Sequence, residues 1–106
     1  MKFNKDDLYI LTAISDSSSI KRTEVKQNLV NELYDNSITD KRANRIIVRS
    51  AGKLAQSGCI KIIPDFYADE DGYIDVRRNV YKITDRGNYI ANLVQKNSYE
   101  EYYIDV

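Results

Sequence analysis

The stretch SITDKRANRIIVRSAGKLAQSG, residues 37–58, combines the clearest helical pattern of this chain with its most uneven charge. Ser37 or Thr39 is a suitable N-cap. Gly58 is typical of the residue just beyond a helix end. The apolar residues recur at helical spacing and share one face; they are Ala43, Ile46, Ile47, Ala51 and Leu54. We therefore expect an amphipathic helix at about 39–57 that buries this face in a core.

The same stretch is the basic part of a balanced chain. The 106 residues hold 16 Lys and Arg against 16 Asp and Glu, but residues 37–57 hold five cations and a single anion. Lys41, Arg45 and Arg49 are spaced four residues apart, and like charges at this spacing cost an isolated helix about 0.2–0.5 kcal/mol per pair. Such a face is typical of a surface that meets a polyanion. An ordinary solvated helix face is the alternative.

Helical periodicity predicts two more helices before this stretch and one near the end of the chain. The first covers about 5–15, with Asn4 or Asp6 as its cap, and the second about 23–34. The last covers about 85–96, with Thr84 as its cap. Its expected inward residues are Tyr89, Ile90, Leu93 and Val94.

Between the third and the last helix, the periodicity changes to that of strands. Residues 59–63 and 80–83 are short runs rich in β-branched residues, and Asp71-Gly72 between them is a turn signal. These runs predict a β-hairpin with a long tip. A chain of this length without repeat or linker predicts one domain over residues 1–106. We expect an α+β, mainly helical fold, a winged helix-turn-helix with three helices, a β-hairpin wing and a C-terminal helix.

Two segments carry a resemblance to known proteins. LAQSGCIKI (Leu54–Ile62) resembles the exit of a recognition helix into a wing, and RRNVYKITDRGNYI (Arg77–Ile90) resembles the return of a wing into the final helix. Together they are similar to the MarR-like and PadR-like winged-helix regulators of bacteria. TubR-type adaptors of plasmid or prophage partition systems share this size and layout. The chain departs from the pattern in its acidic wing tip, at Asp65, Asp69, Glu70 and Asp71.

The resemblance implies that the third helix enters the major groove of double-stranded DNA, and the residue types suit that role. Arg reads guanine and Asn reads adenine through two hydrogen bonds each, and an apolar side chain meets the thymine methyl group. Gly52 would let the helix lie close to the backbone, and Lys53 would meet phosphate. The expected contacts on this helix are Lys41, Arg42, Asn44, Arg45, Val48, Arg49, Gly52 and Lys53.

Secondary DNA contacts are expected on two further segments. Lys21, Arg22 and Thr23 stand where the second helix begins, and a helix N-terminus can hold phosphate. A solvated turn is the alternative. Arg77 and Arg78 stand on the returning wing strand, where they would contact phosphate or the minor groove. Pairing with the acidic wing tip is the alternative for these two.

We expect a homodimeric transcriptional repressor that binds specific sites. One alternative is a centromere-binding adaptor of a partition system, and another is a winged-helix protein-interaction module without DNA binding. The first and last helices should form the dimer interface, together with the acidic, tyrosine-rich tail at 97–106. That tail is the expected dimer or partner contact, and a frayed terminus is its alternative.

The composition argues against an enzyme. The chain has no His, one Cys and no Gly-rich phosphate loop, so neither a cofactor nor a metal is expected. The loop around Gly72 fails as an EF-hand because Tyr67 and Arg78 occupy ligand positions. Cys59 is expected to be a buried structural thiol. Without a membrane-length apolar run or a signal peptide, a cytoplasmic location is expected.

Overall fold

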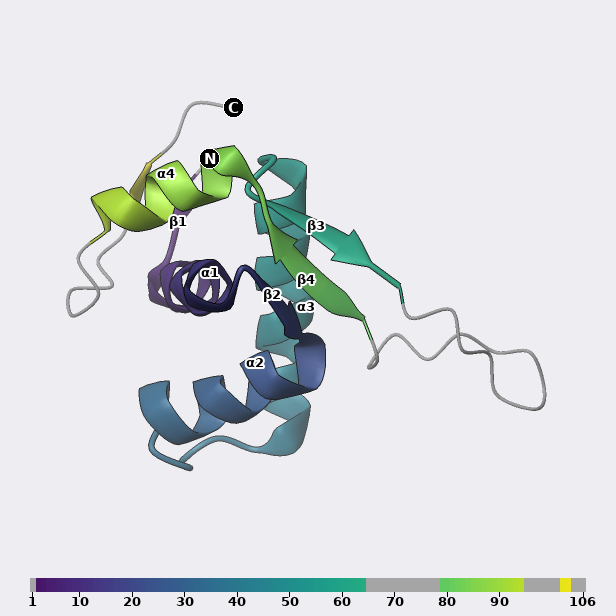
Figure 1. Cartoon of the computed structure of the whole chain (residues 1–106). Coiled ribbons are helices and arrows are strands. Elements are labelled where there is room, and N and C mark those ends of the chain that lie inside the picture. The colour runs from purple at the N-terminus through teal and green to yellow at the C-terminus, as the bar shows by residue number, and fades with distance from the viewer. Residues whose placement is uncertain (1, 65–78, 95–101, 104–106) are drawn as a thin grey trace, which may run out of the picture.

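The computed structural model describes residues 2–64, 79–94 and, for the backbone, 102–103. Within this part the chain forms a mainly helical α+β arrangement with a three-stranded antiparallel sheet (Figure 1). The predicted fold class is therefore confirmed at this level. The helices are α1 (Lys5–Ser17), α2 (Arg22–Asn28), the π-helical turn η1 (Leu29–Leu33), α3 (Asp40–Gln56) and α4 (Asp85–Leu93). The strands are β1 (Lys2–Phe3), β2 (Ser19–Lys21), β3 (Ile60–Ile63), β4 (Val80–Ile83) and β5 (Tyr102–Tyr103).

Helix α1 forms the centre of the core. Asn4 is its cap: the side chain accepts from the Asp7 backbone amide at 3.0 Å, and the Asp7 carboxylate accepts from the Asn4 amide at 2.9 Å. This reciprocal pair satisfies two amides that the first turn leaves without helical partners. Apolar side chains from α2, α3 and α4 pack with those of α1 in one buried cluster. Its fully buried large members are Phe3, Leu8, Ile10, Leu11, Ile14, Val25, Leu29, Ile47 and Leu54.

Helix α3 agrees with its prediction in extent, cap and buried face. It begins after Thr39, whose hydroxyl accepts from the Arg42 amide at 3.2 Å. It ends at Gln56, and Gly58, two residues later, has a φ of +79°. The Gly58 and Cys59 amides donate back to Ala55 and Leu54 carbonyls, the arrangement of a Schellman motif. All five residues of the predicted apolar face are buried: Ala43, Ile46, Ile47, Ala51 and Leu54.

The predicted hairpin strands pair with each other, and an unpredicted strand joins them. In the antiparallel β3–β4 pair, Ile60 lies opposite Ile83 and Ile63 opposite Val80. Strand β2 adds to the other edge of β4, so the order is β2-β4-β3. The sequence before Ile20 is serine-rich and reads as a turn. Its strand forms only because β4 supplies hydrogen-bond partners from a distant part of the chain.

Two predictions for α4 are wrong: Tyr89 is 66% exposed and Leu93 is 51% exposed. Ile90 and Val94 are buried as expected, but Gly87 and Ala91 complete the inward face. The small Gly87 allows α4 to approach the Cys59 carbonyl so closely that an added Cβ would lie 2.1 Å from that oxygen. This contact sets the rotation of α4 and turns its larger residues outward.

The two ends of the described chain meet. Lys2 pairs with Tyr103 and Phe3 with Tyr102, so β1 and β5 form a short antiparallel ladder that the sequence did not indicate. The predicted wing tip, Arg77, Arg78 and the end of the last predicted helix lie outside the described residues. The same holds for most of the predicted tail. Across the described residues, the helices lack the combination of length and apolarity that a membrane span requires.

Two glycines should respond oppositely to alanine. Gly87→Ala places a Cβ against the backbone of Cys59 and should lower the free energy of unfolding by about 3 kcal/mol or more. Gly52, inside α3, has no atom within 4 Å of an added Cβ, so Gly52→Ala should raise it by about 1 kcal/mol. Urea denaturation of both variants measures the difference. Equal effects would contradict the close packing of α4.

Candidate nucleic-acid interface

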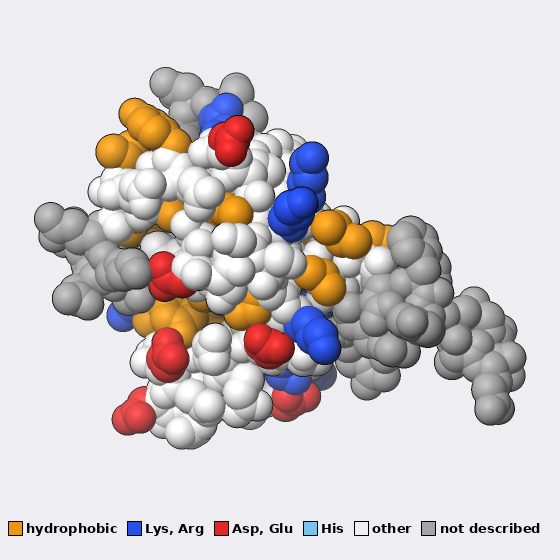
Figure 2. All heavy atoms as spheres, viewed as in Figure 1, with side chains coloured by type: hydrophobic (Ala, Val, Ile, Leu, Met, Phe, Trp, Pro, Cys, Tyr) orange, Lys and Arg blue, Asp and Glu red, His pale blue; other side chains and the backbone are white. Residues whose placement is uncertain are grey.

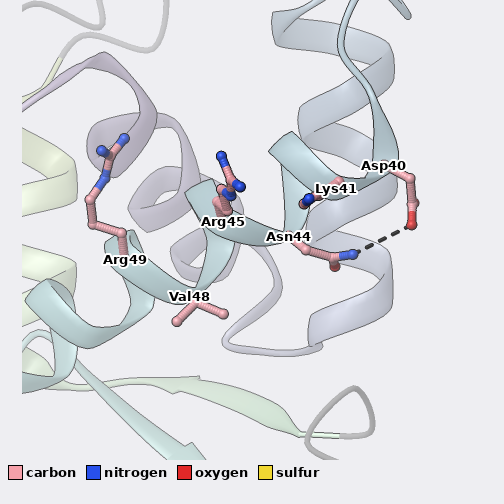
Figure 3. Close-up of a pocket in the computed structure, with 6 residues that line it drawn as sticks. All are labelled: Asp40, Lys41, Asn44, Arg45, Val48 and Arg49. Atoms are coloured by element: carbon pink, nitrogen blue, oxygen red, sulfur yellow. Dashed lines mark hydrogen bonds between the residues drawn. The ribbon is translucent and has the colours of Figure 1, made fainter.

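The outward face of α3 carries a row of cations. Lys41, Arg45 and Arg49 are all exposed and stand one turn apart (Figure 3). None of these three side chains makes a hydrogen bond or an ion pair with another residue that the structure describes. Val48 lies beside them and is 63% exposed. With Asp40 and Asn44 these residues line an open hollow of about 740 Å³ along the helix. We call this surface, Asp40 to Arg49 on the outward side, the α3 face.

The one anion of the helix is neutralised from the neighbouring helix. The Lys26 ammonium on α2 forms an ion pair with the Asp40 carboxylate. The hydrogen bond from Lys26 and then its charge hold the pKa of Asp40 below its ordinary value. Asp40 is highly exposed, so this pair contributes little to stability. Its effect is electrostatic, because it removes an uncompensated negative charge from beside the cation row.

Asn44 is present on the α3 face but already has partners. Its Oδ1 accepts from the Arg22 guanidinium at 3.3 Å, and its Nδ2 donates to Asp40 at 3.4 Å. Both distances are longer than those of strong hydrogen bonds. A bidentate contact with adenine uses the same two groups. Asn44 can therefore read a base with the second lone pair of Oδ1 and the second proton of Nδ2, or by exchanging these weak bonds.

Lys53, an expected phosphate contact, has a structural partner within the chain. Its ammonium lies 2.5 Å from Oδ2 of Asp7, a carboxylate with no solvent exposure. A buried carboxylate without a cation is costly, so this pair holds Lys53 on α1. The other carboxylate oxygen, Oδ1, has no hydrogen-bond partner. Sequence reasoning missed Asp7, although Asn4 three residues earlier is a capping signal.

Arg42 is supported by Tyr34, another residue that the sequence analysis missed. The guanidinium carbon lies 5.9 Å from the centre of the Tyr34 ring, within the range of a cation–π contact. The Tyr34 hydroxyl donates to Asp6 of α1 at 2.5 Å. Burial, and then the hydrogen bond and charge of Asp6, raise the pKa of Tyr34 to about 12. Arg42 is thereby held at the start of α3 by a neutral phenol.

The three residues predicted as secondary DNA contacts at the start of α2 differ in exposure. Lys21 and Thr23 are exposed, whereas Arg22 is 5% exposed and bonded to Asn44. The Arg22 amide, the first of α2, donates to the Asn79 carbonyl at 2.8 Å. Arg22 and this amide are therefore unsuited to the phosphate contact expected of them, since both already have protein partners. Arg22 instead links the start of α2 to the α3 face.

Comparison of the chain with models of protein families, with curated proteins and with solved structures gives no match.

Loss of the Lys53–Asp7 ion pair should lower the free energy of unfolding. Lys53→Met leaves the buried Asp7 carboxylate without a cation and should lower the free energy of unfolding by about 2–3 kcal/mol. Lys41→Met, on the exposed row, should change it by less than about 0.5 kcal/mol. Adding Asp7→Asn to Lys53→Met should recover part of the loss. Denaturant titration of the four proteins tests this, and a double variant that is no better than Lys53→Met would contradict the pairing.

Tyr34 should make stability depend on alkaline pH. Its pKa is about 12 in the folded chain against an ordinary value of 10.0 in the unfolded one. The contribution is therefore complete below pH 10.0 and is lost as pH rises from there toward about 12. The free energy of unfolding of Tyr34→Phe should fall less steeply in this range than that of the wild type. Identical slopes would contradict the raised pKa.

Proposed function

We propose that this chain is a winged-helix protein that binds double-stranded DNA through the α3 face. One observation carries the proposal: Lys41, Arg45 and Arg49 form an exposed row on a chain whose formal net charge is zero. The like charges cost the free helix energy. Phosphates would convert that cost into attraction. The order of three helices, a hairpin and a fourth helix supports the winged-helix assignment, with β3 and β4 as the base of the wing.

The dimensions of the α3 face suit a major groove. An α-helix with its side chains is about 10–12 Å in diameter and fits a groove about 12 Å wide, and the row from Lys41 to Arg49 covers about 12 Å of helix length. In this mode Arg45 and Arg49 donate to guanine edges, and Val48 meets a thymine methyl group. Gly52, exposed and without a side chain, lets the last turns of α3 approach the sugar-phosphate backbone.

The proposed role is that of a homodimeric repressor. Tyr89 and Leu93 support self-association, because they are apolar, one turn apart on α4 and largely exposed. Two-fold symmetry would present two α3 helices to half-sites about 34–36 Å apart. The DNA site would then be an inverted repeat of related half-sites.

Removal of the two arginines tests this function. Selection from a random duplex library would supply the site, and fluorescence anisotropy would measure affinity at several salt concentrations. Arg45→Ala with Arg49→Ala should weaken binding to the selected site by at least about tenfold and lower its preference over a scrambled duplex. Arg86→Ala with Lys5→Ala, on α4 and α1 outside the α3 face, removes the same number of charges and should bind like the wild type.

Two results would overturn the proposal. One is a wild-type protein that binds no duplex even at low salt. The other is a double arginine variant that keeps both the affinity and the site preference of the wild type. Circular dichroism of the double variant checks that the exposed substitutions have left the fold unchanged.

A further inference from the structure

The outer face of the three-stranded sheet carries a second group of cations. Along the strands, side chains alternate between the two faces. Ile20, Tyr81 and Ile60 point inward and are buried. Lys21, Lys82 and Lys61 point outward and are exposed, one from each strand. We call this surface the lysine face. Figure 2 shows Lys and Arg side chains beside apolar ones over the region where β3 and β4 lie in Figure 1.

The strand register brings these three lysines together, although the sequence separates them widely. Lys61 lies directly opposite Lys82, and Ser19 lies opposite Lys82 on its other side. Directly opposite residues have Cβ atoms about 4.5–5.5 Å apart, and diagonal neighbours lie about 7–8 Å apart. Lys21, two residues after Ser19, is therefore a diagonal neighbour of Lys82. Three positive charges thus share one small patch.

The lysine face has no compensating anion on its own strands. Residues 19–21, 60–63 and 80–83 include neither Asp nor Glu. Within the described part of the chain, none of the three lysines forms an ion pair or a hydrogen bond through its side chain. Like charges directly opposite each other destabilise an antiparallel pair. As on the α3 face, the neighbouring positive charges repel one another in the free protein and become favourable beside a polyanion.

We infer that the lysine face is a second DNA contact, which binds the phosphate backbone flanking the segment that α3 occupies. This inference rests on the proposed function and deepens it. Lysine is a compact point charge without the planar fork by which arginine recognises a base. Residues 19–21, 60–63 and 80–83 contain no Asn, Gln or Arg, and lysines alone suit phosphates and carry no sequence preference.

The flanking position follows from the two surfaces taken together. In the proposed mode α3 occupies one major groove, so a surface on other elements meets backbone outside that groove. The two faces are also connected. Lys21 of the lysine face precedes Arg22, whose guanidinium bonds Asn44 of the α3 face. The lysine face therefore begins next to a residue that contacts the α3 face.

Charge removal on the sheet gives the test. Each phosphate contact contributes about 0.9 to the slope of log affinity against log salt. In the proposed homodimer each substitution removes two lysines, so Lys61→Gln and Lys82→Gln should each lower that slope by about 1.8 per bound dimer, and the double variant by about 3.6. The affinity ratio between the selected site and a scrambled duplex should stay unchanged. Lys5→Gln on α1, outside both faces, is the control and should keep the wild-type slope.

Duplex length then tests where the contact lies. One duplex ends at the selected site, and the other extends by one helical turn, about 10 base pairs, on each side. The wild type should show the steeper salt slope only on the long duplex, and a variant that combines Lys21→Gln, Lys61→Gln and Lys82→Gln should show the same slope on both. An equal effect of the lysine substitutions on both duplexes would overturn the flanking position.

The outcomes separate this inference from the proposed function. If the lysine variants keep the wild-type slope while the arginine variant loses binding, the lysine face is not a DNA contact and the proposed function stands. If the lysine substitutions change the site preference, the backbone role is wrong. If the wild type binds no duplex, both proposals fail. The unfolding midpoint of each lysine variant should equal or exceed that of the wild type, since cross-strand repulsion is removed.

Discussion

The arrangement of this molecule depends on one buried carboxylate. Asp7 lies in the first turn of α1, where it accepts from the Asn4 amide and also receives the ammonium of Lys53 from α3. A buried charge without solvent exposure is strongly destabilising unless an opposite charge lies next to it. The pair therefore fixes the position of α3 along and around α1. With one side of α3 held on α1, the row from Lys41 to Arg49 faces solvent.

Three further residues, Gly58, Thr84 and Gly87, extend this order to the rest of the chain. Gly58 ends α3 and directs the chain into β3, and the Thr84 hydroxyl donates to the Cys59 carbonyl at 2.8 Å. The same Thr84 caps α4, so one side chain joins the end of α3 to the start of α4. Gly87 then lets α4 pack against this junction. These contacts join the sheet to the helical body that carries the exposed cations.

The parts of the fold that could be predicted are those with local causes. The apolar face of α3, its Thr39 cap and the turn at Gly58 follow from helix periodicity and backbone conformation. The pairing of residues 60–63 with 80–83 follows from two β-branched runs around a turn signal. The rotation of α4 could not be predicted in this way. The rotation is set by the absence of a side chain at Gly87, whereas helical periodicity favours burial of the large residues Tyr89 and Leu93.

The sequence by itself determined the amphipathic α3, the hairpin and the concentration of cations in residues 37–57, because each is a pattern within a short segment. Only the tertiary structure decided which cations are available to a partner. Lys53 is paired with a residue 46 positions away, and Arg22 is buried against Asn44, so both leave the candidate surface. Lys21, Lys61 and Lys82 join a surface only through strand register. The physical reason is that local backbone geometry repeats along the chain, whereas charge pairing depends on which distant segments the fold brings together.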